Sequence, residues 1–356
     1  MKAEIRRRWL GITMFLAVIL VITGCSSSTN EETGGDNNAD AGGSYSYDFS
    51  HMFPPNHVME TKVVQTFIDK ADKATDGQVQ VTSYPGSQLA EPDGQYEAAA
   101  TGVVDMAFSV HSYTPGQFPL TSVMEMPFLA ESANEGAEVL LKLYDEFPEI
   151  QEEHADTEVL WLGTTEPGQI FTAGKPVKSI EDLKGMRIRS PSPEVNKWLK
   201  EMGATPVSMP LTEAYEAIQK GVVDGTVGPY HTLLDQSLVD VIDYVTVGDF
   251  YMSTFFSVMN KDSWESIDED TKASLSEIKG EEMTMYLADV MDTRKEEAIE
   301  ASEEQGIEFY QLSDKELEEW RANMQPAIDE WIQDKEDKGL PGKEIYERAV
   351  EIASQE

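Results

Sequence analysis

Two arginines in a short stretch of alternating side chains are the residues best suited to bind a ligand. Residues 186–189 alternate apolar and basic side chains, so a strand there places Arg187 and Arg189 on the same face. Arg189 is followed by a Ser-Pro turn and a helix, and ligands of open α/β sheets bind beyond the carboxyl ends of strands. A guanidinium at such a strand end can hold a carboxylate through two parallel hydrogen bonds. Arg189 is therefore a candidate to bind a carboxylate, with a surface or salt-bridged arginine as the alternative that these residues alone leave open, and Arg187 is predicted to be structural.

The motifs of common catalytic and metal sites are missing from the sequence. It has no Gly-x-Ser-x-Gly elbow, no His-Glu-x-x-His zinc motif and no phosphate loop. The single cysteine, Cys25, lies at the edge of an N-terminal apolar run. His51 and His57 are six residues apart, which is not a usual spacing for two metal ligands on one helix face. We expect no enzymatic activity, no cofactor and no metal, and turnover of a bound ligand would contradict this.

An internal repeat indicates which elements position Arg189. Residues 96–105 and 215–224 are identical at seven of ten aligned positions, and a Ser-x-Pro pattern precedes both copies. Each copy has a helix-forming segment and then a glycine, Gly102 or Gly221, where a helix ends with positive φ. Two valines follow in each copy and favour a strand. Strand–helix–strand units form parallel sheets with right-handed crossovers, so two copies predict two similar α/β lobes.

The length of the chain agrees with two lobes rather than one core. We assign residues 44–165 to lobe I, which roughly residues 253–300 complete, and residues 166–252 to lobe II. Residues 301–356 are predicted to form C-terminal helices that pack on the lobes.

The N-terminus has the pattern of a lipoprotein signal. Four basic side chains fall within the first eight residues, and residues 9–22 are almost all apolar, a run shorter than the roughly 20 residues that span a bilayer. The run ends in Thr-Gly-Cys, and small residues before a cysteine resemble a bacterial lipobox. We predict that residues 1–24 are a signal peptide and that Cys25 is lipidated. Residues 25–43 hold no large apolar side chain and are predicted to be a flexible tether. The protein would then be secreted and anchored to the outer face of the cytoplasmic membrane.

The formal net charge of −39 excludes one class of partner. Nucleic-acid binding needs basic patches, so no nucleic acid is expected as a partner, and adsorption to anionic lipid is disfavoured. The acidity does not argue against an anionic ligand, because one cation in a shielded cleft outweighs distant, screened charges.

The segment that contains Arg189 belongs to a longer series of motifs. Residues 180–191 read Ile-Glu-Asp-Leu-Lys-Gly-Met-Arg-Ile-Arg-Ser-Pro. This resembles the signature of the DctP family, the substrate-binding subunits of tripartite ATP-independent periplasmic (TRAP) transporters. The resemblance extends from about residue 47 to residue 335, and it is specific because several spaced motifs agree in order. The further motifs lie at residues 77–79, 84–85, 125–128, 203–207 and 215–225.

The resemblance implies a bilobal α/β fold of the type II periplasmic-binding-protein kind. Two α/β lobes, strands that cross between them, a ligand cleft that closes and a helical C-terminal region are expected. It also implies that the protein captures a small organic acid and delivers it to a small and a large integral membrane subunit. Import would then be driven by an ion gradient rather than ATP. We expect a monomer that touches the membrane only through its lipid anchor. Two alternatives stay open: the binding protein of an ATP-driven importer, and the ligand-presenting subunit of a sensor.

The resemblance also implies particular ligand contacts. The family's carboxylate-binding arginine falls on Arg189, but Gln169 stands where many members carry a second arginine. This weakens the case for a second charged group on the ligand; Gln169 would bond a keto or hydroxyl oxygen, or else be a solvated loop residue. Gly228 stands where many members have an asparagine, which opens space that Tyr230 could fill with its ring. An aromatic acid or a branched keto acid then fits as well as a C4-dicarboxylate.

The first lobe is expected to supply the opposite wall of the cleft. His111 and Tyr113 follow the strand end that corresponds to Arg189 in the repeat, although a lone histidine is more often structural. Other candidates lie at strand-to-helix turns or near the crossing between the lobes. These are Phe53, Asn56, Leu211 and Tyr251.

Overall fold

The computed structural model describes residues 44–355. The predicted signal peptide of residues 1–24, the lipidated Cys25 and the tether of residues 25–43 lie outside the described residues. The described residues all belong to one compact unit. Within the described part of the chain, no helix combines the length and the apolar character needed to cross a membrane.

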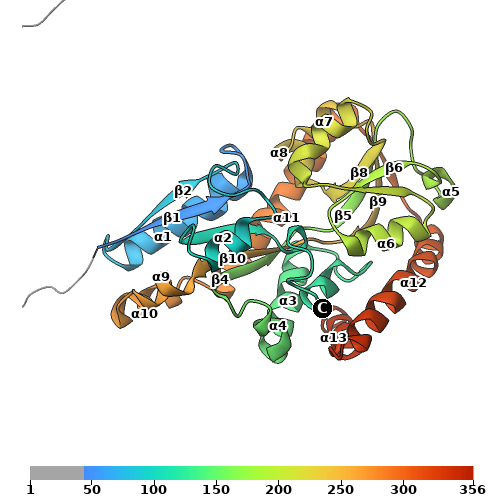
Figure 1. The fold of residues 1–356 in the computed structure, drawn as a ribbon. Helices are drawn as coiled ribbons and strands as arrows, with labels where there is room; N and C mark the ends of the chain where they lie inside the picture. Colours follow the sequence, from blue (N-terminus) through green and yellow to red (C-terminus); the bar gives the residue numbers. More distant parts are fainter. Residues whose placement is uncertain (1–43, 356) are drawn as a thin grey trace, which may run out of the picture. The chain divides into compact units, whose positions relative to one another are not determined.

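A five-stranded sheet forms the centre of lobe I, with the strand order β2-β1-β3-β10-β4 (Figure 1). The three N-terminal strands are parallel to one another, and β10 runs antiparallel to both β3 and β4. The strands are β1 (Tyr45–His51), β2 (Val79–Tyr84), β3 (Met106–Val110), β4 (Thr157–Thr164) and β10 (Thr254–Asn260).

A six-stranded sheet forms the centre of lobe II, with the strand order β11-β9-β5-β8-β6-β7. The strand that carries Arg189, β6, is parallel to β7 and β8, whereas β5 is antiparallel to β8 and β9. The edge strand β11 belongs to the segment 301–356, which was expected to be helical. The strands are β5 (Gly168–Thr172), β6 (Arg187–Ser190), β7 (Thr205–Ser208), β8 (Gly225–Pro229), β9 (Tyr244–Tyr251) and β11 (Glu308–Gln311).

The chain passes between the two sheets through two short connections. It leaves lobe I between β4 and β5 and returns between β9 and β10. The connections are bonded to each other: the backbone N–H of Thr165 donates to the carbonyl of Ser253 at 2.9 Å, and the N–H of Ser253 donates to the Thr165 hydroxyl at 3.0 Å. Short crossovers of this kind are the segments about which two lobes commonly rotate.

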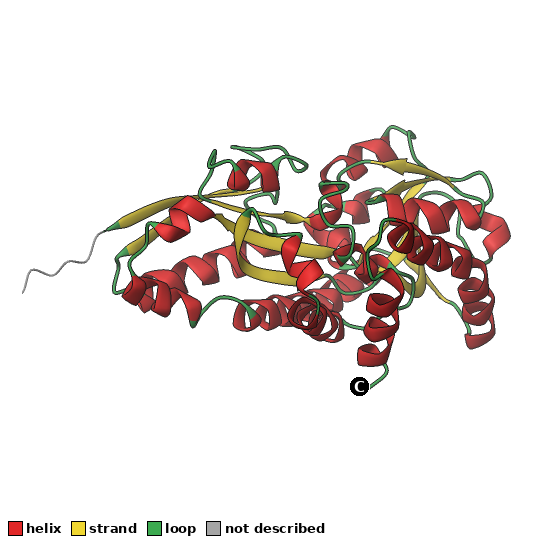
Figure 2. Ribbon diagram, turned by 60° about the horizontal axis from the view of Figure 1, so that its bottom comes forward, coloured by secondary structure: helices red, strands yellow, loops and turns green. Residues whose placement is uncertain are grey.

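Helices cover both faces of each sheet (Figure 2). Lobe I has the π-helix η1 (Met59–Val64), α1 (Gln65–Ala74), α2 (Gln95–Ala100), η2 (His111–Tyr113), η3 (Thr121–Glu125), α3 (Ala133–Glu146), α4 (Pro148–Glu152), α9 (Lys261–Glu265) and α10 (Glu269–Ser276). Lobe II has α5 (Ile180–Leu183), α6 (Pro193–Glu201), η4 (Leu211–Glu213), α7 (Ala214–Gln219), α8 (His231–Asp235) and η5 (Leu238–Asp240). The long C-terminal helices are α11 (Glu281–Glu304), α12 (Asp314–Asp337) and α13 (Gly342–Ala353).

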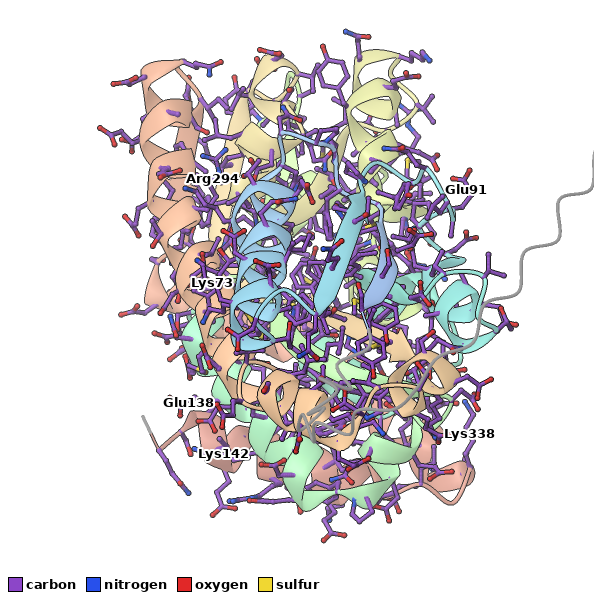
Figure 3. The ribbon with its side chains drawn as sticks, turned by 90° about the vertical axis from the view of Figure 1, so that its left-hand side faces the viewer. Lys73, Glu91, Glu138, Lys142, Arg294 and Lys338 are labelled. Atoms are coloured by element: carbon purple, nitrogen blue, oxygen red, sulfur yellow. The ribbon has the colours of Figure 1, made fainter. Side chains whose placement is uncertain are left out.

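The C-terminal helices connect the lobes. Helix α11 packs on α3 and β4 of lobe I and on α8 of lobe II, where Arg294 pairs with Asp235 at 2.6 Å. Helix α12 packs on α6 and on α13, and α13 packs in turn on α3. Charged side chains project from these helices and their neighbours (Figure 3); Glu138 and Lys142 lie one turn apart on α3, with their charged atoms 3.6 Å from each other.

The repeat has the same backbone in both lobes. Gly102 after α2 has a φ of 73°, and Gly221 after α7 has a φ of 65°, as expected for residues that end a helix. The paired valines do not begin the strands as predicted. The first valine of each pair, Val103 or Val222, lies exposed in the turn, and the second packs into the core of its lobe. Because the turn must bring the chain back to the sheet, the strands begin only at Met106 and at Gly225.

A close approach of two strands gives a prediction for the stability of lobe II. A Cβ atom on Gly225 would lie 2.2 Å from the carbonyl oxygen of Phe171 and 3.0 Å from Cα of Thr172. We expect Gly225→Ala to lower the free energy of unfolding by about 1–3 kcal/mol or more, because backbone atoms of two paired strands must separate. Urea denaturation checks this. The control is Gly94→Ala, whose Cβ would approach nothing closer than 3.7 Å; equal midpoints for the two variants would contradict the prediction.

Candidate ligand-binding site

Arg189 lies at the end of β6 with its guanidinium buried and held by neutral groups. Its side chain is 1% exposed, Nε donates to the carbonyl of Met209 at 2.9 Å, and one terminal nitrogen lies 3.4 Å from the carbonyl of Val227. The described arginines that form ion pairs are Arg187, Arg294 and Arg348; Arg189 is not among them. A buried cation without a counter-ion is unfavourable, so the position is suited to receive an anion.

Tyr113 joins Arg189 to the opposite lobe. Its hydroxyl oxygen accepts a hydrogen bond from the other terminal nitrogen of Arg189 at 3.1 Å and from the backbone N–H of Leu211 at 2.9 Å. Tyr113 follows β3 of lobe I, whereas Arg189 and Leu211 belong to lobe II. Since both bonds use the oxygen as acceptor, the hydroxyl proton stays available for a further acceptor. The structure therefore brings three of the predicted site residues together.

Tyr251 is a fourth predicted residue in this region. It is buried, and its ring lies directly over Gly168, where a Cβ atom would be 2.3 Å from a ring carbon. Burial is the main cause that raises the pKa of Tyr251, and the positive charge of Arg189 opposes the rise. Tyr251 is thus close to the guanidinium and stays a neutral phenol at physiological pH.

Glu125 is a buried acid in the same region that was not predicted as a site residue. It ends η3 and is 2% exposed, and neither carboxyl oxygen has a hydrogen-bond partner among the described residues. Burial, and after it the negative charge of Glu194, raise the pKa of Glu125 to about 8. The charge of Arg189 acts in the opposite direction. The signal in the sequence was one acidic residue within the apolar run of residues 123–128.

Gln169 lies on β5 with all of its hydrogen-bonding capacity used inside lobe II. Its Nε2 donates to the carbonyl of Pro167 at 3.0 Å and to the carboxylate of Asp249 at 2.6 Å. Its Oε1 accepts from the backbone N–H of Gly248 at 2.8 Å and of Asp249 at 3.0 Å. The side chain is fully buried, so it is not a solvated loop residue. In this arrangement Gln169 has no free polar atom to offer a ligand.

The space beside Gly228 is bounded by lobe II itself. A Cβ atom there would lie 3.3 Å from the Thr232 hydroxyl and 3.6 Å from the Phe171 ring. The ring of Tyr230 stacks on Phe309 of β11, with centroids 6.3 Å apart, and is buried in the core of lobe II. The structure thus places Tyr230 in that core and gives it a packing role.

His111 also makes its contacts within its own lobe. Its Nε2 lies 3.0 Å from Nε2 of His154, so one ring donates and the other accepts. Burial lowers the pKa of His111 well below its usual value, and the ring is therefore neutral. Its other nitrogen, Nδ1, is buried and has no partner among the described residues.

Phe53 lies at a second contact between the lobes, whereas Asn56 lies outside. The Phe53 ring is 5.0 Å from that of His57, which meets His231 of lobe II edge to face at 5.9 Å. His231 bonds the buried carboxylate of Glu166 through its backbone N–H at 2.8 Å and its Nδ1 at 3.0 Å. Asn56 is exposed and lines a surface groove between η1 and α11.

Two contacts therefore connect the lobes across the region of Arg189: Tyr113 with Arg189, and His57 with His231. Within residues 44–355, no group of three or more His, Cys, Asp and Glu side chains is placed to hold a metal ion. The arrangement offers one unneutralised guanidinium, a tyrosine hydroxyl and aromatic walls, which is a site for binding an organic anion.

The effect of a Gln169 substitution on stability tests whether this side chain has a structural role. We expect Gln169→Ala to lower the free energy of unfolding by about 2–5 kcal/mol, because two backbone N–H groups and the half-buried carboxylate of Asp249 lose their partner. Urea denaturation measures this, and Gln219→Ala on exposed α7 is the control. Unchanged stability in Gln169→Ala would contradict the structural role.

Tyr113 gives a test of the contact between the lobes. Tyr113→Phe keeps the ring but leaves Leu211 N–H and one Arg189 donor without an acceptor. We expect ligand affinity to fall roughly five- to tenfold, the equivalent of about 1–1.4 kcal/mol. Isothermal titration calorimetry measures the affinity. Tyr215→Phe on the exposed side of α7 is the control, and equal affinities in both variants would disprove the role of Tyr113.

Comparison with known proteins identifies the family. The family model for bacterial extracellular solute-binding protein, family 7 (DctP), matches residues 49–334. The C4-dicarboxylate-binding periplasmic protein DctP of Rhodobacter capsulatus is 27% identical over 295 residues, which cover 79% of this chain and 85% of that protein.

Two solved structures of TRAP solute-binding proteins have the same fold. One, from a marine metagenome, is specific for aromatic acid ligands and holds 3-hydroxybenzoate; it matches with a TM-score of 0.84 and 29% identity, covering 88% of this chain and 99% of its own. The other, from Rhodoferax ferrireducens, holds copurified benzoate; its TM-score is 0.84 and its identity 26%, covering 88% of this chain and 98% of its own.

The matched residues include both sheets and most of the C-terminal helices, so the likeness is not confined to one lobe. The predicted bilobal α/β fold and the predicted family are confirmed. Members of the family work outside the cytoplasm and bind solutes for transport. The chain belongs to the DctP family of bacterial extracellular solute-binding proteins, the binding proteins of TRAP transporters.

Proposed function

We propose that this protein captures a small monocarboxylic acid between its lobes and delivers it to the membrane subunits of a TRAP transporter. The observation that carries the proposal is the guanidinium of Arg189, which is buried, lacks a counter-ion among the described residues and is shared with Tyr113 of the opposite lobe. A ligand carboxylate would supply the missing negative charge and accept hydrogen bonds from the guanidinium.

The charges around Arg189 favour one carboxylate rather than two. Gln169 occupies the position where a second cation was expected from the family pattern, and its polar atoms are already bonded. Glu125 lies close enough to Arg189 for the two charges to interact, so a second anionic group nearby would meet a carboxyl group instead of a cation. This supports a monocarboxylate over a C4-dicarboxylate.

The aromatic side chains favour an acid with a ring or a branched apolar body. Phe53, Tyr113 and Tyr251 are buried at or near the contacts between the lobes. The two structural relatives hold 3-hydroxybenzoate and benzoate, and both are aromatic monocarboxylates. Aromatic acids are therefore the first class to test, with branched 2-keto acids as the second.

The delivery step follows from the connections between the lobes. The crossovers at Thr165 and Ser253 allow rotation, and a ligand that bonds Arg189 and meets Tyr113 favours the closed arrangement. The membrane subunits would then recognise the closed protein. Lipidation of Cys25 would keep the protein at the membrane surface, and no step in this cycle needs catalysis.

A thermal-shift screen tests the proposal. We expect an aromatic or branched monocarboxylic acid to raise the melting temperature, since ligand at 100 times its Kd adds about 2.7 kcal/mol of stability. Arg189→Ala and Arg189→Lys should lose the shift, because neither can offer two parallel donors.

The matched control is Arg187→Ala, which removes a guanidinium from the exposed first residue of the same strand, where it pairs with Asp224 at 2.6 Å. It should keep the ligand-induced shift. Shifts with C4-dicarboxylates alone would replace the monocarboxylate proposal, and shifts with sugars or amines alone would remove the carboxylate proposal altogether.

A further inference from the structure

A cavity with several ionisable side chains in its wall lies where lobe I, lobe II and helix α12 meet. Its volume is about 270 Å³, and its walls come from η2 and η3 of lobe I, the first turn of α6 in lobe II, and the end of α12. Arg189 does not line this cavity, so it is separate from the carboxylate position. Glu125 contributes to its wall from η3, and Glu194 contributes from α6.

The buried polar atoms of the cavity wall lack partners to an unusual extent. Among the described residues, no hydrogen bond of good geometry is made by Nδ1 of His111, by the hydroxyls of Ser112 and Thr114, or by either carboxyl oxygen of Glu125, although the hydroxyls of Ser112 and Ser192 lie near enough to Glu125 to lower its pKa. All four residues line the same cavity. Buried polar groups are nearly always satisfied, so this wall is built to hold water or another polar species.

The charges at the cavity leave two carboxyl groups unmatched. Lys335 and Lys338 each pair with Asp334 at 2.9 Å, and Lys197 pairs with Glu330 at 3.2 Å. Glu125 and Glu194 have no such cation within residues 44–355. They come from opposite lobes, so closing of the lobes brings two carboxyl groups together in a poorly hydrated space.

We propose that Glu125 takes up a proton when the lobes close, so that acidic conditions favour the closed, ligand-holding state and alkaline conditions favour opening and release. The proposal rests on the proposed function for the part that concerns the ligand. The device is the cavity itself: Glu125 is buried and lines it from lobe I, and Glu194 lines it from lobe II, so separation of the lobes would move the two carboxyl groups apart and admit water.

The electrostatics point in the same direction. Burial and then Glu194 raise the pKa of Glu125 to about 8, so in this closed arrangement the carboxyl holds its proton at neutral pH. The hydroxyls of Ser192 and Ser112 and the charge of Arg189 oppose the rise. A ligand carboxylate on Arg189 would cancel that last opposing charge, so ligand binding would strengthen proton uptake.

Other elements that pack on η3 supply no competing cation. Strand β10 has no ionisable side chain. The basic side chains of α3 and α13 pair elsewhere: Lys142 with Glu138, Arg348 with Glu146, and Lys343 with Glu347. On η2, His111 is neutral and bonded to His154, and Tyr113 bonds Arg189.

The direction in which pH changes lobe closing follows from the difference in the pKa of Glu125 between the open and the closed state. Opening would hydrate Glu125 and return its pKa toward the ordinary value of 4.5, whereas with the lobes in contact, as in this structure, the pKa is about 8. Between these values the closed state binds one more proton, so closing weakens as the pH rises. Ligand affinity is expected to fall by at most about tenfold per pH unit in that window and to level off above it.

The first experiment needs no ligand. Small-angle X-ray scattering of the full chain across this pH window should show the closed fraction falling in the wild type. Glu125→Gln, which is always neutral, should show a closed fraction that does not change with pH. The control is Glu153→Gln: burial raises the pKa of Glu153 to about 7, but its bonds to Leu120 and Thr121 stay within lobe I. This variant should behave like the wild type.

The second experiment counts protons. Calorimetric titration with 3-hydroxybenzoate near pH 6.5, in two buffers of different ionisation heat, should show uptake of about one proton per ligand in the wild type and none in Glu125→Gln. If Glu125→Gln does not fold, Glu194→Gln removes the repelling charge and should shift the pH midpoint of closing downward.

The outcomes separate this inference from the proposed function. A closed fraction and an affinity that are the same at every pH would overturn the inference even if 3-hydroxybenzoate binds tightly. Failure of every acid to bind, with closing still dependent on pH and on Glu125, would overturn the proposed function alone. Closing induced at pH 8 by added Na⁺ or Ca²⁺ would show that the carboxyl pair takes a metal cation instead of a proton.

Discussion

A positive charge buried without a counter-ion is the constraint on which the rest of this structure depends. The carbonyls of Met209 and Val227 orient the Arg189 guanidinium but cannot neutralise it. An unpaired ion in a protein interior costs several kcal/mol relative to water, so the position of Arg189 favours the binding of an anion. The strand end, the Ser-Pro turn and the tyrosine from the opposite lobe all hold this one charge in place.

Two acidic side chains near the site, Glu125 and Tyr251, limit which ligands can enter. Glu125 and Tyr251 are both buried and stay protonated in the closed arrangement at neutral pH, so they can act as neutral walls while Arg189 carries the only charge of the three. The same carboxyl group would become a repelling anion if water reached it. Selectivity for the charge of the ligand and sensitivity to hydration thus come from one side chain, because the pKa of a buried acid depends on how completely it is buried.

Much of the fold and part of the site could be predicted from the sequence. The repeat around Gly102 and Gly221 is local, and it predicted two lobes of the same construction. Arg189 could be identified because strand alternation and the following turn are local signals too. Gln169 could not be understood in this way: its partners are amides in an irregular part of β9, some 80 residues further along the chain, so its role depends on tertiary structure. Glu125 stood out as an acid among apolar residues, but nothing local revealed that Glu194 would face it.

The two crossovers and helix α11 together determine how the molecule can move. The bonded pair of Thr165 and Ser253 acts as a pivot, and a pivot alone would let the lobes swing freely. Helix α11 is attached to both lobes away from that pivot, so any swing must bend it or slide its contacts. A 24-residue helix resists bending along its whole length. It would therefore oppose rotation of the lobes away from the angle at which the helix is unstrained. The resting angle of the lobes is then an elastic property of the C-terminal region, and it can be retuned by residues that never meet the ligand.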